Sequence, residues 1–435
     1  MSALYFFIMR IRQSTLILAG LAAAGFLFRF FVARAVPQPF VYDQEAYYGY
    51  ALGILKHGLH ADLYRLYGYP LIIAPLIALF GVGSPLPWTL FHALLDTTTA
   101  LMVFWIAKRL DSPPQAGNDT HARVACILYL FNPFTAGYTG VLLSEIVTVF
   151  LVALISLLLL LFIRKQSLRI GIAISVLLGY LPQVRPVFIG WSLVVWAWVV
   201  GQTVPLVARA KEKLVYGTLL CLFFTLPFWY TIGGNLVAYR QLRVLGVEPT
   251  FTRELYASLF IGRGMPFTDT AWGDWPVQAR QAWIAFTAPG DADGRKAVAD
   301  RHLAIAINII RADPSAFIRS RLAKMGYLWE KHFIYPYLMG KPTPPVKMLI
   351  YWGNIMLLAL AAIGLVLAVK VQRRMGLVGA SLFFYITIAH MFSTSEERFS
   401  LPAYPWIAVF AGYAVTVIVS WFRTSWLAAH PQRSR

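Results

Sequence analysis

The sequence predicts an all-α fold: a polytopic bundle of about ten membrane-spanning helices with a partly helical domain outside the membrane. Two observations carry this prediction. Of the 435 residues, 59% are hydrophobic and only 13% are charged, and the mean hydropathy is +0.63. Soluble domains contain about 25% charged residues, so the solvent of this chain must largely be lipid. We therefore expect an integral membrane protein. Its expected location is the plasma membrane, specifically a bacterial inner membrane, although composition by itself indicates only a membrane.

The second observation is a series of apolar runs of nearly the length that a membrane span requires, about 20 residues. The runs cover residues 14–33, 85–107, 124–141, 144–163, 169–183, 186–201, 214–232, 347–369, 376–393 and 401–422. The first has no convincing small-residue cleavage site, which favours an uncleaved span over a signal peptide.

Charge placement orients these spans. Basic residues concentrate in alternate connecting segments, around Arg10, Lys108, Arg164, Lys211 and Lys370. The positive-inside rule then places both termini in the cytoplasm. The net charge of +19 follows the same pattern. Because the sequence contains no zinc-ligand spacing or RNA-binding motif, we expect membrane lipids as partners and no nucleic acid.

The threading divides the chain into three parts. They are an N-terminal transmembrane module at 1–232 with its first outer loop at 34–84, an extracytoplasmic domain at 233–346, and a C-terminal transmembrane module at 347–435. The apolar stretch 69–81 is too short to cross, so we expect a helix in the outer interface or dipping into the membrane. In the outer domain, Asp313 followed by Pro314 predicts the start of an amphipathic helix.

Ionisable residues within or beside spans are candidates for function, because burying them is costly. The candidates are Asp43, Glu45, His92, Asp96, Glu145, Arg185, Glu396, Glu397 and Arg398. The predicted topology places them at the outer surface, although they come from separate segments. This convergence favours an outer-face site.

Each candidate also has a structural interpretation. Asp43 is a suitable N-cap for the helix that follows it, and Ser144 for a helix beginning at Glu145. The remaining alternatives are snorkelling at the interface for Arg185, an ion pair with Glu396 or Glu397 for Arg398, and a mutual pair for His92 and Asp96.

The motifs occur in a recognisable order: D-Q-E opening an aromatic helix, G-Y-P-L-I-I-A-P-L-I-A-L-F-G, S-E and R-P at the heads of spans, and E-E-R-F-S-L-P-A-Y-P near the end. This order resembles the GT-C superfamily of polytopic glycosyltransferases, notably the protein O-mannosyltransferase and lipid A aminoarabinose transferase group. The resemblance covers the N-terminal two-thirds of the membrane part and the last hairpin. The domain at 233–346 is outside it.

The resemblance implies a GT-C-like fold and a membrane glycosyltransferase that uses a polyprenyl-phosphate-linked sugar at the outer face. Its acceptor would be a lipid, a glycan or a protein. Asp43 occupies the position of the family's catalytic carboxylate. The family's acidic pair is adjacent, whereas Gln44 separates Asp43 from Glu45 here, so Glu45 stays as the alternative.

The chemistry requires the same groups. A base must take the acceptor proton, and a partly dehydrated site would raise the pKa of a carboxylate for that task. The phosphate leaving group requires cations, for which arginine is well suited. We expect Arg185, Arg398 and, more weakly, Lys341 to bind the phosphate. Glu145 would position the acceptor or share a divalent cation (Mg²⁺ or Mn²⁺) with Asp43. His92 and Asp96 would support the site.

Two other classes remain open. A lipid-linked glycan ligase or polymerase would also use outer arginines and a large outer loop, but it would not require the early acid. A transporter or flippase more often has inverted repeats and broken helices at the midplane. The sequence has no internal repeat, and its charges gather at one face.

Overall fold

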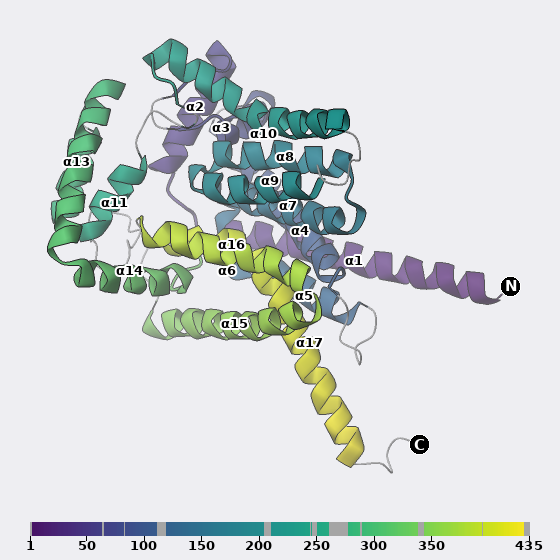
Figure 1. Cartoon of the computed structure of the whole chain (residues 1–435). Helices are drawn as coiled ribbons and strands as arrows, with labels where there is room; N and C mark the ends of the chain where they lie inside the picture. The colour runs from purple at the N-terminus through teal and green to yellow at the C-terminus, as the bar shows by residue number, and fades with distance from the viewer. Residues whose placement is uncertain are drawn as a thin grey trace.

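The structure, a computed structural model, contains only helices in the part of the chain that it describes, which confirms the all-α prediction (Figure 1). The described residues are 2–62, 65–81, 83–110, 119–203, 210–243, 245, 250–260, 277–287, 289–337, 343–393 and 395–429. The α-helices of the first half are α1 (Ser2–Ala35), α2 (Asp43–His57), α3 (Gly68–Phe80), α4 (Leu86–Ala107), α5 (Thr120–Leu130), α6 (Pro133–Tyr138), α7 (Glu145–Lys165), α8 (Leu168–Val184) and α9 (Ile189–Thr203). Those of the second half are α10 (Ala210–Tyr239), α11 (Thr250–Phe260), α12 (Val277–Thr287), α13 (Ala292–Ala312), α14 (Pro314–Trp329), α15 (Pro344–Val371), α16 (Arg373–Met391) and α17 (Tyr404–Ala429), and the short 3₁₀ helices are η1 (Pro186–Phe188) and η3 (Glu397–Ala403).

Eight helical stretches in the described part are long and apolar enough to cross a membrane. They correspond to eight of the ten expected spans. The expected span at 169–183 is α8, which has 17 residues and is apolar but short. The expected span at 124–141 is wrong as a single helix, because the chain there divides into α5 and α6.

The break between α5 and α6 has a local cause. The side chain of Asn132 accepts hydrogen bonds from the backbone N–H groups of Phe134, at 2.9 Å, and Thr135, at 3.3 Å, and so caps α6. Pro133 occupies the first position of α6, where its missing N–H costs nothing. An N-cap followed by proline ends one helix and begins another, and the freed carbonyls of α5 then need other donors.

Close contacts between helices depend on glycine. A Cβ atom on Gly179 of α8 would lie 2.1 Å from the carbonyl oxygen of Phe224 on α10. A Cβ atom on Gly364 of α15 would lie 1.8 Å from that of Phe410 on α17. Small residues allow helix backbones to approach closely, which drives association where lipid replaces water. These positions tie α10 and α15 to the core.

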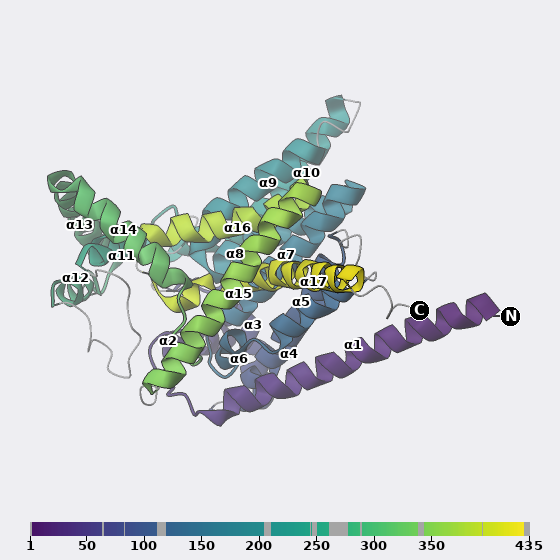
Figure 2. The ribbon, with the colours of Figure 1, turned by 90° about the horizontal axis from the view of Figure 1, so that it is seen from below.

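The first turns of α1 and the last turns of α17 lie toward one end of the bundle, and α11, α13 and α14 lie at the other (Figures 1 and 2). Asp313 accepts a hydrogen bond from the backbone N–H of Ala316 at 2.8 Å, so the predicted cap of α14 is confirmed. The stretch expected at 69–81 forms α3, whose first residue, Gly68, leaves no room for a Cβ atom against the backbone of Gln183 at the end of α8.

Candidate functional site

Four segments that are distant in sequence meet in one cluster of charged side chains. Asp43 is the first residue of α2, Glu145 the first of α7, Arg185 follows α8, and Arg398 lies in η3. A guanidinium nitrogen of Arg398 lies 3.3 Å from a carboxylate oxygen of Asp43, and another lies 3.6 Å from one of Glu145. Arg185 approaches the same oxygen of Glu145 to 3.1 Å. We call these four residues the Asp43–Arg398 cluster.

Arg398 is the centre of this cluster. Its Nε donates to one oxygen of Glu396 at 2.5 Å, and its Nη2 reaches the other at 3.4 Å. This two-point contact fixes the plane of the guanidinium and leaves its outer nitrogens toward Asp43 and Glu145. The ring of Phe399 lies 5.4 Å from this guanidinium and 4.9 Å from that of Arg185, so one aromatic ring contacts both cations.

The segment after α14 holds η3 in place. The ammonium of Lys331, which is buried, donates to the carbonyl oxygen of Glu397 and to the hydroxyl of Ser400, the latter at 2.7 Å. The backbone N–H of His332 donates to the Glu397 carboxylate at 2.8 Å. Burial lowers the pKa of Lys331 to about 8, although the charge of Glu397 opposes the shift. The sequence analysis missed Lys331, since it lies in a loop without a recognisable motif.

The chain enters α2 through a strained residue. Tyr42 has a φ of 56°, a left-handed conformation that is uncommon for a residue with a side chain. Gln44 then fixes the start of the helix, donating to the carbonyl of Pro39 at 2.7 Å and accepting from the N–H of Leu142 at 2.9 Å. Backbone strain of this kind concentrates at functional sites, where surrounding contacts maintain it.

Neither acid-bearing helix is capped as the structural alternatives expected. The N-cap position of α2 is Tyr42, and Asp43 follows it inside the first turn. Ser144 occupies the N-cap position of α7, but its side chain makes no capping hydrogen bond. The Asp43 carboxylate is turned toward arginines, which withdraws it from the helix backbone.

Two further arginines act on Asp43, and the sequence analysis missed both. Arg65, in the loop before α3, forms an ion pair with the other carboxylate oxygen of Asp43 and lies over the ring of Tyr47 at 5.2 Å. Arg253, on α11, also lowers the pKa of Asp43 through its charge. Two residues separate Arg65 from the G-Y-P motif that follows it, and this nearness to the motif is the signal that could have marked it as a candidate.

The electrostatics of Asp43 contradict the expectation of a raised pKa. Partial burial alone would raise the pKa of this carboxyl group. The charges of Arg65 and Arg398 outweigh that effect and lower the pKa from 3.8 to about 2. Asp43 is therefore a carboxylate at physiological pH and, with its arginines in place, a weak base.

The other acid of the opening motif lies elsewhere. Glu45 is exposed and makes no ion pair within the described part of the chain, whereas Asp43 is two residues away in the cluster. Lys341, the weaker phosphate-binding candidate, lies outside the described residues. Arg398 pairs with Glu396, one of its two expected partners, while Glu397 binds His332.

His92 and Asp96 do not pair with each other, so the mutual ion pair expected for them is wrong. Nε2 of His92 lies 3.2 Å from the hydroxyl of Tyr69. Asp96 is fully buried, forms an ion pair of 2.6 Å with Arg29 and accepts a hydrogen bond from Tyr129 at 2.5 Å. Arg29, on α1, provides the stronger partner that the expectation lacked.

The cluster does not offer a divalent cation a set of oxygen ligands. The Arg398 guanidinium lies between the carboxylates of Asp43 and Glu145 and contacts both. Mg²⁺ and Mn²⁺ require several oxygen ligands without a competing cation among them. Within the described ranges, no group of three or more His, Cys, Asp or Glu side chains is arranged to hold a metal ion. The residues present thus do not fit the Mg²⁺ or Mn²⁺ site that the sequence suggested.

Comparison with known proteins supports the fold. No protein-family model and no curated protein sequence matches the chain. Among solved structures, the apo oligosaccharyltransferase of Archaeoglobus fulgidus is similar, with a TM-score of 0.54, 11% identity, and coverage of 95% of this chain and 52% of that one. The A. fulgidus oligosaccharyltransferase AglB in complex with an inhibitory peptide and a dolichol-phosphate gives a TM-score of 0.48, 12% identity, and coverage of 97% and 53%.

The chain spans about half the length of these structures. At this level of identity the likeness concerns the fold, and the predicted GT-C-like fold is confirmed. Together with the eight apolar helices of the described residues, this likeness supports an integral membrane protein whose fold resembles that of the A. fulgidus oligosaccharyltransferase.

Proposed function

We propose that the protein is a membrane glycosyltransferase that moves a sugar from a polyprenyl-phosphate donor to a hydroxyl of a lipid, glycan or protein acceptor. The observation that carries this proposal is the Asp43–Arg398 cluster, which brings two carboxylates and two arginines together, with Arg65 beside them, in a GT-C-like bundle. In this proposal the protein lies in a bacterial inner membrane, with the cluster on the extracytoplasmic side and both termini in the cytoplasm.

The arginines supply the phosphate site. Charge-assisted hydrogen bonds are strongest at about 2.7–2.9 Å, and the contacts from Arg398 to Asp43 and Glu145 are longer, at 3.3 and 3.6 Å. A phosphate oxygen can therefore replace a carboxylate as the better partner of this guanidinium. Arg65 and Arg185 flank Arg398 and supply further charge. In this proposal, Glu145 positions Arg185 and Arg398.

Donor binding would also prepare the base. With its arginines in place, Asp43 has a pKa of about 2 and little affinity for a proton. A phosphate that draws Arg398 away removes a positive neighbour and adds a negative one, and both changes raise the pKa of Asp43. The carboxylate thus becomes a competent base when the donor is present, which limits proton abstraction to the loaded site.

The transfer is then a direct displacement. Asp43 accepts the proton of the acceptor hydroxyl while the oxygen of that hydroxyl forms a bond to the anomeric carbon of the sugar. The bond from that carbon to the phosphate oxygen breaks, and the electron pair leaves with the polyprenyl phosphate held by Arg398. A single displacement inverts the configuration at the anomeric carbon, and no step of it uses a metal.

The test is a transfer assay with purified protein and a panel of radiolabelled polyprenyl-phosphate sugars. We expect wild-type protein to transfer label from at least one donor, and Asp43→Asn to be slower by about 10²–10⁴-fold, the usual contribution of a general base. Glu45→Gln is the matched control, since Glu45 is exposed and two residues away, and it should retain wild-type activity. Full activity of Asp43→Asn would remove Asp43 from its role, and no transfer by wild type from any donor would overturn the proposal.

A further inference from the structure

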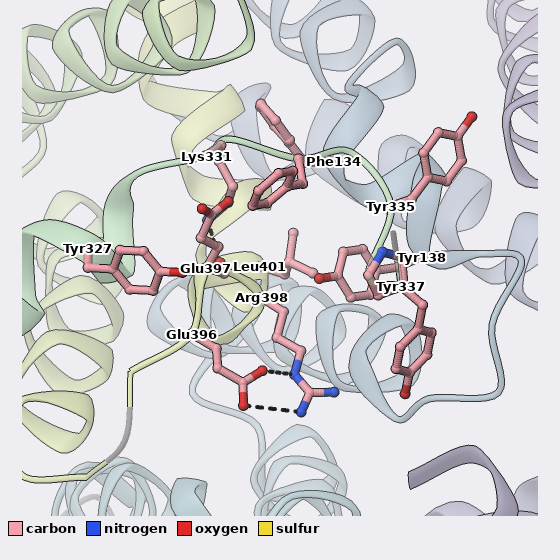
Figure 3. A pocket seen from close by; sticks show the side chains of 12 residues that line it. Phe134, Tyr138, Tyr327, Lys331, Tyr335, Tyr337, Glu396, Glu397, Arg398 and Leu401 are labelled. Atoms are coloured by element: carbon pink, nitrogen blue, oxygen red, sulfur yellow. Dashed lines mark hydrogen bonds and ion pairs between the residues drawn. The ribbon is translucent and has the colours of Figure 1, made fainter. Parts of the chain in front are cut away.

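A pocket adjoins the Asp43–Arg398 cluster and shares Arg398 with it, and the other residues of its lining have no role in the proposed transfer. Three segments that are distant in sequence form its walls: α6, the stretch from the end of α14 to Tyr337, and η3 with Glu396 just before it. Figure 3 shows the rings of Tyr138 and Tyr327 directed into it from opposite sides, with Glu397 and Leu401 between them and Arg398 at its edge.

The walls of the pocket are rigidly held. Lys331 binds the carbonyl of Glu397 and the hydroxyl of Ser400, and His332 binds the Glu397 carboxylate through its backbone N–H and its ring, at 2.8 and 2.7 Å. These contacts fasten the stretch after α14 onto η3. A pocket whose polar groups are already positioned binds a ligand without first ordering them.

The lining favours a sugar over a lipid chain or a small anion. Aromatic rings of Phe134, Tyr138 and Tyr327 supply flat apolar faces, which suit the C–H face of a pyranose or furanose ring. Phenol hydroxyls and carboxylates supply hydrogen-bond partners for sugar hydroxyl groups. A hydrocarbon chain would remove water from the charged groups of Lys331, Glu396, Glu397 and Arg398 without giving them new partners, and because these two acids and two bases balance, the lining offers a small anion no net positive charge.

The position of Arg398 indicates that the pocket receives the sugar of the donor and not that of the acceptor, because Arg398 belongs to both the pocket lining and the cluster. In a polyprenyl-phosphate sugar the ring is attached directly to the phosphate. A phosphate held by Arg398 therefore places the attached ring within reach of the pocket, whereas the acceptor must approach the anomeric carbon from the opposite side.

We propose that this pocket, with Tyr138 and Tyr327 as its walls, binds the sugar ring of the donor and sets which sugar is transferred. The proposal rests on the proposed function. Tyr138 is the most informative residue to substitute, because its hydroxyl is directed into the pocket and makes no hydrogen bond with the part of the chain that the structure describes.

The experiment measures the binding of two kinds of probe to the purified, full-length protein in detergent. One is bare polyprenyl phosphate, and the other is a set of polyprenyl-phosphate hexoses and pentoses. We expect wild type to bind at least one sugar-bearing probe more tightly than the bare lipid. Tyr138→Phe should lose up to about tenfold in affinity for that probe, the equivalent of one hydrogen bond, and Tyr138→Leu should lose more. Neither change should alter the affinity for bare polyprenyl phosphate.

Two controls separate the possible failures. Tyr216→Phe, on α10 and away from the pocket lining, should match wild type for both probes. Arg398→Gln should weaken the binding of both, which reports on the phosphate site. The pocket proposal is overturned if no sugar-bearing probe binds better than the bare lipid, or if the Tyr138 variants affect both probes equally or neither. If wild type binds neither probe, or Arg398→Gln binds both normally, the proposed function fails, and the pocket proposal with it. Thermal unfolding of each variant identifies any loss caused by misfolding.

Discussion

Two networks of charged side chains in the described part of the chain differ in how completely the protein satisfies them. In the first, Arg29 and Asp96 are both fully buried. Arg29 donates to Asp96 at 2.6 Å, to the carbonyls of Gly25 and Tyr129 at 3.2 and 3.1 Å, and to that of Leu130. The second carboxylate oxygen of Asp96 accepts the hydroxyl of Tyr129. Each charged group has its full set of partners inside the protein.

The Asp43–Arg398 cluster is arranged differently. Arg398 is shared among the carboxylates of Glu396, Glu145 and Asp43, and only the first contact is short. The side chain of Asp43 is 28% exposed. Its contacts to Arg398 can therefore be exchanged for those of a ligand at little cost.

The difference teaches how to distinguish structural from functional charges in a membrane protein. Arg29 supplies donors to the carbonyls of Tyr129 and Leu130 at the end of α5, where the break before α6 interrupts the regular helical hydrogen bonds. Its charge is then neutralised by Asp96. A closed network of this kind stabilises the fold, whereas an open network with shared, longer contacts is available for chemistry.

The largest effect should come from breaking the closed network. Asp96→Asn leaves the Arg29 guanidinium buried beside a neutral side chain, which should destabilise the protein by about 3–5 kcal/mol. Asp43→Asn removes a partly exposed charge, and its cost should be smaller, about 2 kcal/mol or less. Thermal unfolding of the purified variants measures the contrast.

Arg29→Met combined with Asp96→Asn provides the control for that contrast. Removing both charges eliminates the uncompensated cation, so the double variant should recover part of the stability that Asp96→Asn loses. Equal unfolding temperatures for Asp96→Asn and wild type would refute the structural role of the pair. A loss of stability in Asp43→Asn as large as that in Asp96→Asn would refute the difference between the networks.

A smaller effect concerns the pH dependence of the open network. The pKa of Asp43 in the unliganded protein is about 2, below its ordinary value of 3.8. Its ion pairs therefore stabilise the fold above pH 3.8, and this contribution disappears as the pH falls through about 2. If the donor phosphate displaces Arg398, the acid limb of kcat, which reports the donor complex, should lie at higher pH than the acid limb of kcat/KM, which reports the free enzyme.

Arg65→Gln sharpens that measurement. It removes one of the two main charges that lower the pKa of Asp43, so the acid limb of kcat/KM should move to higher pH and approach that of kcat. Coincident acid limbs in the wild-type enzyme would show that donor binding leaves the base unchanged. The exchange of partners at Arg398 would then have to be abandoned.

Much of the fold could be predicted from the sequence, because hydropathy reports the bundle directly. The convergence of Asp43, Glu145, Arg185 and Arg398 could also be anticipated, since ends of spans on one side of a membrane are necessarily near one another. The break near Asn132 was missed, although Asn-Pro is a recognisable boundary signal. The apolar character of the whole run favoured a single span over the local helix-boundary signal of Asn132 and Pro133.

The remaining parts depend on contacts that no local pattern reports. Arg29 stands alone in an apolar run, and its partner Asp96 is 67 residues away. Arg65, Arg253 and Lys331 lie in or beside loops whose paths only the three-dimensional arrangement defines. The pKa of Asp43 was expected to be raised because dehydration was considered without these neighbouring cations.

The smallest effect on the wild-type enzyme should be that of removing metal ions. Because the Arg398 guanidinium already lies between Asp43 and Glu145, dialysis against EDTA should leave the transfer rate within about twofold of its value with added Mg²⁺ or Mn²⁺. Loss of activity on chelation and recovery with either ion would contradict this arrangement.

The Arg398→Gln variant tests whether the guanidinium is the reason that the wild-type enzyme needs no metal ion. Without the guanidinium, the carboxylates of Asp43, Glu145 and Glu396 lose their shared cation. Mg²⁺ should then raise the unfolding temperature of this variant and leave that of wild type unchanged, since a free cation can replace the missing arginine only where the arginine is gone.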